Sequence, residues 1–167
     1  YTFKGSLRKR ITAEQFSDMV GAIIDPIFPD SIMKFKPKYS PSFVPPGGYF
    51  ARAAFVANNS FLIALGRPNR ENVTTGRESQ ANLLQALELT NGERFNAMLK
   101  RGATKWQSRY PDGDSMLSAF YSLSLGRKPN SKEKAVAMKI LGNAPSPEDI
   151  QDFFWAALLL PEIQIID

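Results

Sequence analysis

Apolar side chains recur at three- and four-residue intervals over most of the second half of the chain, and this spacing places them on one side of an α-helix. Glycine follows several of the periodic runs, at Gly92, Gly126 and Gly142, where it favours the end of a helix. Ser146-Pro147 is a strong start signal, because serine caps a helix and proline suits its first turn. The pattern predicts helices over 78–90, 93–109, 116–125, 130–141 and 150–160.

A further helix is predicted near the start of the chain. Thr12 and Gln15 have the spacing of a capping box, and apolar residues follow at helical intervals up to Ile24. Asp25-Pro26 ends this helix, because a residue before proline is disfavoured in the α region. The predicted helix spans 12–24, and residues 61–65 are predicted to form a single helical turn.

The segment 26–48 holds six prolines and closes with Gly47-Gly48, so it cannot be a helix. Its aromatic residues are too numerous for a disordered linker, and we expect an ordered irregular loop over the core. Residues 50–56 (FARAAFV) could form a short strand. The predicted fold class is therefore mainly α, with about six helices around one core.

The chain has 167 residues, which is enough for one compact domain without disulfides. We expect a single helical domain over 1–167. Because the sequence begins with Tyr1 and ends soon after an apolar run, we interpret it as the C-terminal fragment of a larger multidomain protein. No window approaches the ~18 consecutive apolar residues of a membrane-spanning helix.

Cysteine and histidine are both absent from the chain. This excludes a thiolate nucleophile, a Ser-His-Asp triad and the usual zinc sites. The close acidic pairs, Asp25 with Asp30 and Asp112 with Asp114, lie beside proline or glycine, where aspartate commonly makes local hydrogen bonds. We assign no catalytic residue and no metal ligand, and we favour a fragment that is not an enzyme by itself.

An arginine-rich stretch precedes the helix predicted over 78–90. Guanidinium groups match carboxylates and phosphates, and a helix N-terminus adds N–H donors, so this stretch is a candidate anion site. The alternative is that the arginines pair with Glu71 and Glu78 and fasten the segment to the fold. The candidate anion-binding residues are Arg67, Arg70, Thr74, Thr75 and Arg77.

A second candidate surface interleaves basic and aromatic side chains, as surfaces that stack on bases or sugars do. Its residues are Lys34, Phe35, Lys36 and Tyr39. The alternative is that the aromatic rings anchor the proline-rich loop to the core. The formal net charge is +5, but the longest basic run is Arg8-Lys9-Arg10, which argues against a nucleic-acid partner.

Several stretches resemble one known family. They are residues 65–73 (LGRPNRENV) with Arg77, residues 80–92 (QANLLQALELTNG), residues 8–15 (RKRITAEQ), residues 121–133 (YSLSLGRKPNSKE) and residues 152–159 (DFFWAALL). Together they resemble the C-terminal domain of unknown function fifteen fifty-three, which occurs beside cytochrome c-like domains in planctomycete-type and Bacteroidetes proteins.

The resemblance implies a periplasmic or cell-surface protein that carries any haem in another domain, with no cofactor in this fragment. Relatives often have cysteines near the positions of Thr74 and Thr75, and the absence of cysteine here argues against a redox or metal role for that loop. The resulting hypothesis is a non-catalytic helical accessory module, with other domains of the same polypeptide and an anionic glycan as candidate partners. The alternative is one part of an oxidoreductase or polysaccharide-degrading enzyme whose active site needs an upstream domain.

Overall fold

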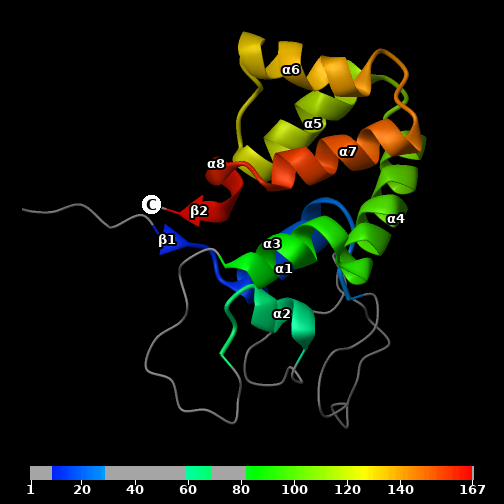
Figure 1. Ribbon diagram of the computed structural model, residues 1–167. Helices are drawn as coiled ribbons and strands as arrows, with labels where there is room; N and C mark the ends of the chain where they lie inside the picture. Colours follow the sequence, from blue (N-terminus) through cyan, green and yellow to red (C-terminus); the bar gives the residue numbers. More distant parts are fainter. Residues whose placement is uncertain (1–8, 29–58, 69–81, 167) are drawn as a thin grey trace, which may run out of the picture.

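A computed structural model describes residues 9–28, 59–68 and 82–166, and its architecture is mainly helical (Figure 1). This confirms the predicted fold class. The elements in chain order are β1 Lys9–Arg10, α1 Ala13–Ile23, α2 Ser60–Ala64, α3 Leu83–Asn91, α4 Glu93–Arg109, α5 Gly113–Leu125, α6 Ser131–Leu141, α7 Pro147–Leu158, α8 Pro161–Gln164 and β2 Ile165–Ile166.

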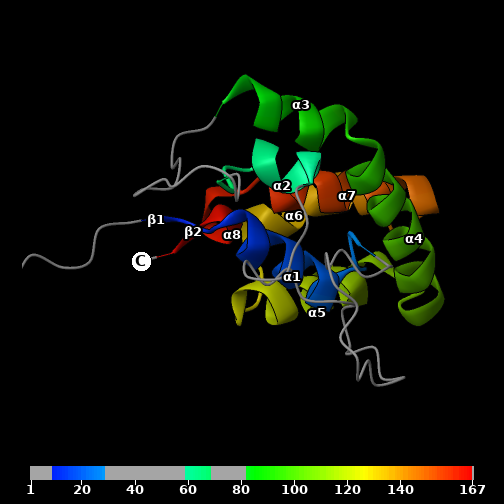
Figure 2. The same cartoon turned by 90° about the horizontal axis from the view of Figure 1, so that it is seen from below.

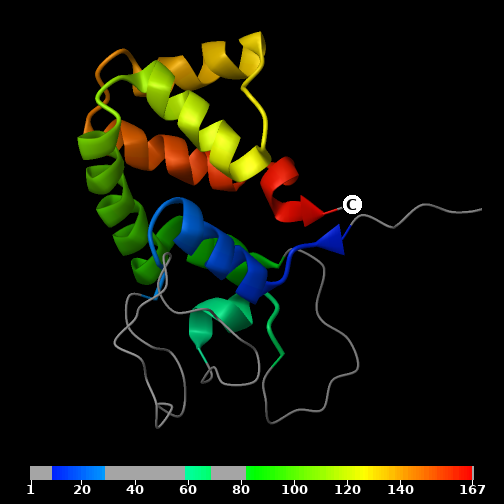
Figure 3. The ribbon, with the colours of Figure 1, turned by 180° about the vertical axis from the view of Figure 1, so that it is seen from behind.

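The described helices form two groups joined by α4. Helices α1, α2 and α3 lie near one end of α4, and α5, α6 and α7 lie near its other end (Figures 1 and 3). Within the first group α2 contacts both α1 and α3, and it lies between them when the molecule is seen from below (Figure 2). In the second group α7 packs against both α4 and α6.

Side-chain caps fix where several helices begin. The Thr12 hydroxyl accepts from the Gln15 N–H at 3.2 Å, and the Gln15 side chain accepts from the Thr12 N–H at 2.9 Å, which confirms the predicted capping box. Equivalent boxes start α6 at Asn130 and α7 at Ser146. The α3 helix begins at Leu83, later than predicted, because the extended Asn82 caps it by accepting from the Gln85 N–H.

The core is continuous from one helix group to the other and is rich in aromatic rings. The Trp106 ring of α4 lies 5.2 Å from that of Phe154 in α7 and 6.1 Å from that of Phe120 in α5, between ring centroids. Toward the first group, Phe95 of α4 lies against Phe61 of α2 at 6.1 Å. Edge and stacked ring pairs of this kind add to the stability that burial alone provides.

The α4 helix approaches the end of α1 closely at Gly102. A Cβ added to Gly102 would lie 2.3 Å from Cγ2 of Ile24, so this contact requires glycine. Beside it the Asp25 carboxylate is buried and accepts from Nε of Arg101 at 2.7 Å and from the Lys105 ammonium. These contacts hold the end of α1 on the flank of α4.

The first and last elements meet in a small antiparallel ladder, in which Arg10 of β1 lies opposite Ile165 of β2. The Arg10 guanidinium donates to the side chains of Gln85, at 2.5 Å, and Gln164, at 2.9 Å. Segments far apart in the sequence are therefore joined at one point beside α3.

Several predicted bounds differ from those in the structure, because α5 begins at Gly113 rather than at 116 and α7 begins at Pro147 rather than at 150. The turn predicted over 61–65 is α2, and the helix predicted over 150–160 is α7 followed by the short α8, which begins at Pro161. Gly126 ends α5 in the left-handed region with φ of 65°, as its position after the periodic run predicted.

The strand considered over 50–56, and the loop prediction from residue 29 onward, lie outside the described residues. Among the helices that the structure describes, none is long and apolar enough to cross a membrane.

Replacing Gly102 by alanine tests the close contact between α4 and α1. Alanine has a helix propensity about 1 kcal/mol better than glycine, but the new methyl group would displace the stiff Ile24 side chain. We expect a net loss of about 1–2 kcal/mol in the free energy of unfolding, measured by urea denaturation. The control Lys100→Ala, at an exposed position of the same helix, should change stability by less than about 0.5 kcal/mol. A Gly102→Ala variant as stable as the wild type would contradict this description of the contact.

Candidate binding site

Of the predicted anion-site residues, the structure describes only Arg67. Its side chain is buried, with Nε 3.4 Å from Oε1 of Glu14 in α1. This pairing agrees with the alternative in which an arginine fastens the segment to the fold, and its described carboxylate belongs to α1. Arg70, Thr74, Thr75 and Arg77 lie outside the described residues, as do Lys34, Phe35, Lys36 and Tyr39 of the second candidate surface. Both sites remain predictions.

The described aspartates of the two acidic pairs have structural partners. Asp25 is held by Arg101 and Lys105 at the junction of α1 and α4. Asp112 caps α5 by accepting from the Ser115 N–H at 2.8 Å, and its hydrogen bonds with the Ser115 hydroxyl and N–H lower the pKa of its carboxyl group. Asp114 pairs with Lys134 of α6 at 2.6 Å. These carboxylates cap helices and connect them.

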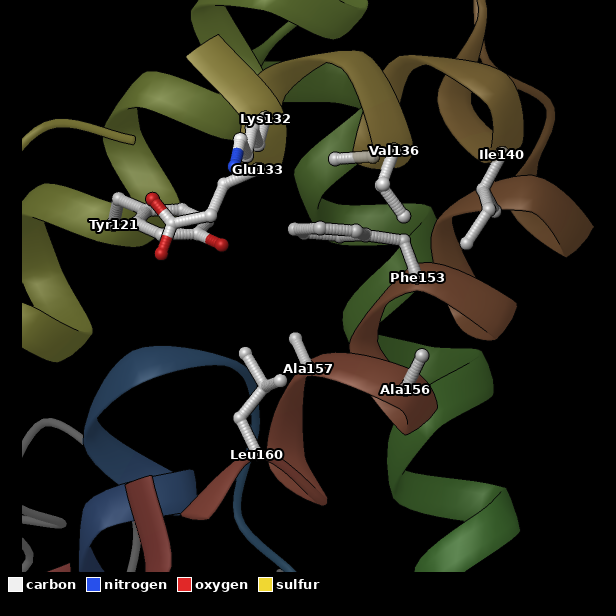
Figure 4. A pocket seen from close by; sticks show the side chains of 10 residues that line it. Tyr121, Lys132, Glu133, Val136, Ile140, Phe153, Ala156, Ala157 and Leu160 are labelled. Carbon is white, nitrogen blue, oxygen red and sulfur yellow. The ribbon is translucent and has the colours of Figure 1, made fainter. Parts of the chain in front are cut away.

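A groove runs between α6 and α7, and its volume is about 320 Å³ (Figure 4). Its walls are mainly apolar side chains from both helices, with one residue from α5 and one from the turn before α8. The lining residues are Tyr121, Lys132, Glu133, Val136, Ala137, Ile140, Phe153, Ala156, Ala157 and Leu160.

Small side chains explain why the groove is hollow. Ala137 of α6 and Ala156 and Ala157 of α7 line it, and an alanine occupies far less space than the Val, Ile and Phe residues beside it. Val136, on the lip of the groove, leaves 62% of its surface exposed, and Leu160 leaves 37%. The groove is therefore an open apolar surface.

The polar lining residues gather at one end of the groove. Figure 4 shows Tyr121, Lys132 and Glu133 together there, with Val136, Ile140 and Phe153 farther along. Tyr121 is only 4% exposed, and its hydroxyl makes no hydrogen bond with the parts of the chain that the structure describes. Burial, and next the nearby charge of Glu133, raise the pKa of this phenol. The hydroxyl therefore keeps its proton at neutral pH and can donate a hydrogen bond.

Arg127 organises this polar end. Its guanidinium donates two hydrogen bonds to Glu133, at 2.7 and 2.9 Å, and two to Glu162 of α8, at 2.6 and 2.9 Å. The same group lies over the Tyr121 ring, 5.3 Å from its centroid. The loop after α5 is thus tied to α6 and α8, and the Tyr121 ring is held beneath the guanidinium.

The Glu133 carboxylate is fully engaged by this arrangement. Its hydrogen bonds with Arg127, and one from the Asn130 N–H at 2.7 Å, lower its pKa from 4.5 to about 2. It is therefore an anion at neutral pH, and its role is to hold Arg127 and the start of α6.

The groove was not predicted from the sequence, although its residues lie in conspicuous stretches. The apolar residues of α6 and α7 fit a core-facing pattern equally well, and only the packing of the two helices shows that part of that face is open. The adjacent alanines at 156 and 157, in a helix otherwise rich in large apolar residues, were the available signal.

The described part of the chain is thus a helical domain with an open apolar groove and a polar cluster at one end of it. Residues 2–141 match the PSD1 family, described as a protein of unknown function (DUF1553). This match covers most of the chain, so the protein belongs to that family, which confirms the family that the sequence resembles; residues 152–159 lie beyond the matched range. The match ends with the last residue of α6, and α7 and α8 follow it. No curated protein and no solved structure matches the chain.

Replacing Glu133 by glutamine tests the Arg127 cluster. The folded-state pKa of Glu133 lies below its ordinary value, so its charge stabilises the fold above about pH 4.5, and this contribution is lost as the pH falls toward 2. The Glu133→Gln variant should therefore have a lower thermal unfolding midpoint than the wild type at pH 7. This difference should shrink between pH 4.5 and pH 2.

The matched control is Glu148→Gln, because Glu148 is exposed in α7 and forms no ion pair with the described residues. Its unfolding midpoint should stay close to that of the wild type at pH 7. Equal effects of the two substitutions at pH 7, or an effect of Glu133→Gln that does not change with pH, would contradict the assignment of this cluster.

Proposed function

We propose that this chain is a non-catalytic helical binding module and that the groove between α6 and α7 is its binding site. The observation that supports the proposal is the groove itself, an open apolar surface with a polar cluster confined to one end. Sites for small ligands commonly combine apolar walls with a few placed polar groups in this way.

The energetics favour an occupied groove. Apolar surface in contact with water is unfavourable by roughly 25 cal/mol per Å². Val136, Ile140 and Leu160 are partly or largely exposed on the walls and lip of the groove. A ligand that covers them gains this free energy without rearranging the core, because the groove is already open.

We place this module in an exported, periplasmic or cell-surface protein that carries any haem in another domain, as the sequence resemblance implies. In that setting the module serves as an accessory to the other domains of the polypeptide. An anionic glycan at the predicted anion site, which consists of Arg67, Arg70, Thr74, Thr75 and Arg77, is a separate proposal that arises from the sequence and does not involve the groove.

An environment-sensitive anionic naphthalene dye tests the proposed site. We expect its fluorescence to rise on binding to the wild-type protein, and we expect Val136→Asp to weaken this binding at least several-fold by placing a charge on the apolar lip. Val136 is exposed, so the substitution should leave the circular dichroism spectrum and the unfolding midpoint nearly unchanged.

The matched control is Leu123→Asp, because Leu123 is 56% exposed on α5 and does not line the groove. This variant should bind the dye as the wild type does. A second comparison uses Leu83→Asp, at the most exposed leucine of α3. If this variant loses the dye and Val136→Asp keeps it, the binding site is on α3 and the proposal is wrong.

A further inference from the structure

We propose that the groove binds a small amphiphilic carboxylate, with its apolar body between α6 and α7 and its carboxylate at Tyr121 and Lys132. This inference rests on the proposed function and names the chemical class of its ligand. It is based on the hydrogen-bond donors at the polar end, on the balance of charge there and on the size of the groove.

The donors at the polar end are Tyr121 and Lys132. The Tyr121 hydroxyl lines the groove, belongs to a residue more than nine-tenths buried, and has no hydrogen-bond partner among the described residues. The hydroxyl oxygen itself is not among the buried described atoms that lack a partner, so it is accessible from the open groove. A ligand oxygen that reaches it can therefore accept its hydrogen bond. Lys132 lies at the same end, and it forms no ion pair with the residues that the structure describes.

The charges at this end do not repel an incoming carboxylate strongly. Arg127 and Lys132 together carry two positive charges, and Glu133 and Glu162 carry two negative charges, so the cluster is neutral overall. Each glutamate carboxylate accepts a pair of hydrogen bonds from the Arg127 guanidinium. Lys132 is therefore the charged group in the lining that remains available to a ligand, and it selects an anion.

This arrangement also distinguishes a carboxylate from other head groups. A cationic head group would have to compete with Arg127 for glutamates that already accept several hydrogen bonds. A neutral hydroxyl would satisfy Tyr121 but would gain no charge interaction with Lys132. A carboxylate has two acceptor oxygens and one negative charge, so it satisfies both side chains at once.

The size of the groove limits the apolar body of the ligand. Its volume of about 320 Å³ lies near the lower end of the range for ligand sites in proteins, about 300–1,000 Å³. A medium-chain or aromatic carboxylate therefore fits better than a long-chain lipid. The walls beyond the polar end, among them Val136, Ile140 and Phe153, offer only hydrocarbon to the tail.

The test is a calorimetric titration of the full chain with octanoate, octan-1-ol and octylammonium, which share one apolar tail and differ in head group. We expect octanoate to bind roughly tenfold more tightly than octan-1-ol, since a hydrogen bond to a charged group contributes more than a neutral one. Octylammonium should bind most weakly. Equal affinities for octanoate and octan-1-ol would overturn the ligand class.

Two substitutions at the polar end sharpen the test. Tyr121→Phe removes only the hydroxyl, and Lys132→Gln removes only the charge, and each should weaken octanoate binding ~5- to 10-fold. The control is Lys139→Gln, at an exposed lysine of the same helix that does not line the groove, and it should leave octanoate affinity unchanged. Equal effects of Lys132→Gln and Lys139→Gln would overturn the assigned head-group site.

The outcomes separate this inference from the proposed function. If the dye and octan-1-ol bind in the groove and octanoate shows no advantage, the binding module stands and the carboxylate class is wrong. If the dye, octan-1-ol and octanoate all fail to bind to a folded wild-type protein, both proposals are wrong. Unfolding midpoints of the variants near that of the wild type exclude loss of folding as the cause of weak binding.

Discussion

The packing of α4 determines the arrangement of the described helices. One side of this helix is buried along its length, at Phe95, Met98, Leu99, Gly102, Ala103 and Trp106. Its first turns contact α3 and, through Phe95, the Phe61 ring of α2. Gly102 in its middle contacts the end of α1, and Trp106 in its last turns contacts α5 and α7. Since one rigid helix contributes to both groups, the core is shared between them.

The groove is a consequence of this packing. The α7 helix buries Phe154 and Leu158 fully and places Phe153, Ala156 and Ala157 beside α6. The α6 helix rests on α7 and leaves Val136 exposed beside small alanine side chains. Arg127 then fixes the polar end by joining Glu133 to Glu162, so the tyrosine beneath it is held in place before any ligand arrives. Such preorganisation lowers the entropic cost of binding.

Features set by short stretches of sequence were predictable. The capping box at Thr12 depends on two residues three apart, and the start signal at Ser146-Pro147 depends on two adjacent residues. The structure shows both where the sequence placed them. The start of α3 was placed too early because an asparagine inside an apolar run can also act as an N-cap. Here Asn82 does so.

Features that depend on contacts between distant residues were not predictable. The sequence made Arg67 a candidate anion-binding residue, with pairing to Glu71 and Glu78 as the alternative, and neither interpretation indicated its described carboxylate partner, Glu14 of α1. The Arg127 cluster joins residues from the loop after α5, from α6 and from α8. The spacing of apolar residues along the chain does not predict contacts between polar side chains of different elements. The groove exists because the side chains of α6 and α7 do not fill the space between the two helices. Residue types alone do not predict such a gap, since it depends on how the helices pack.

Amide NMR spectra of the ¹⁵N-labelled full chain during an octanoate titration test the central claim most directly, because each signal reports one place in the fold. The account predicts the largest shift changes at Tyr121, around Lys132 to Ile140 in α6 and around Phe153 to Leu160, the elements that line the groove. Changes concentrated in α3, at its exposed Leu83, Leu84 and Leu87, would contradict it.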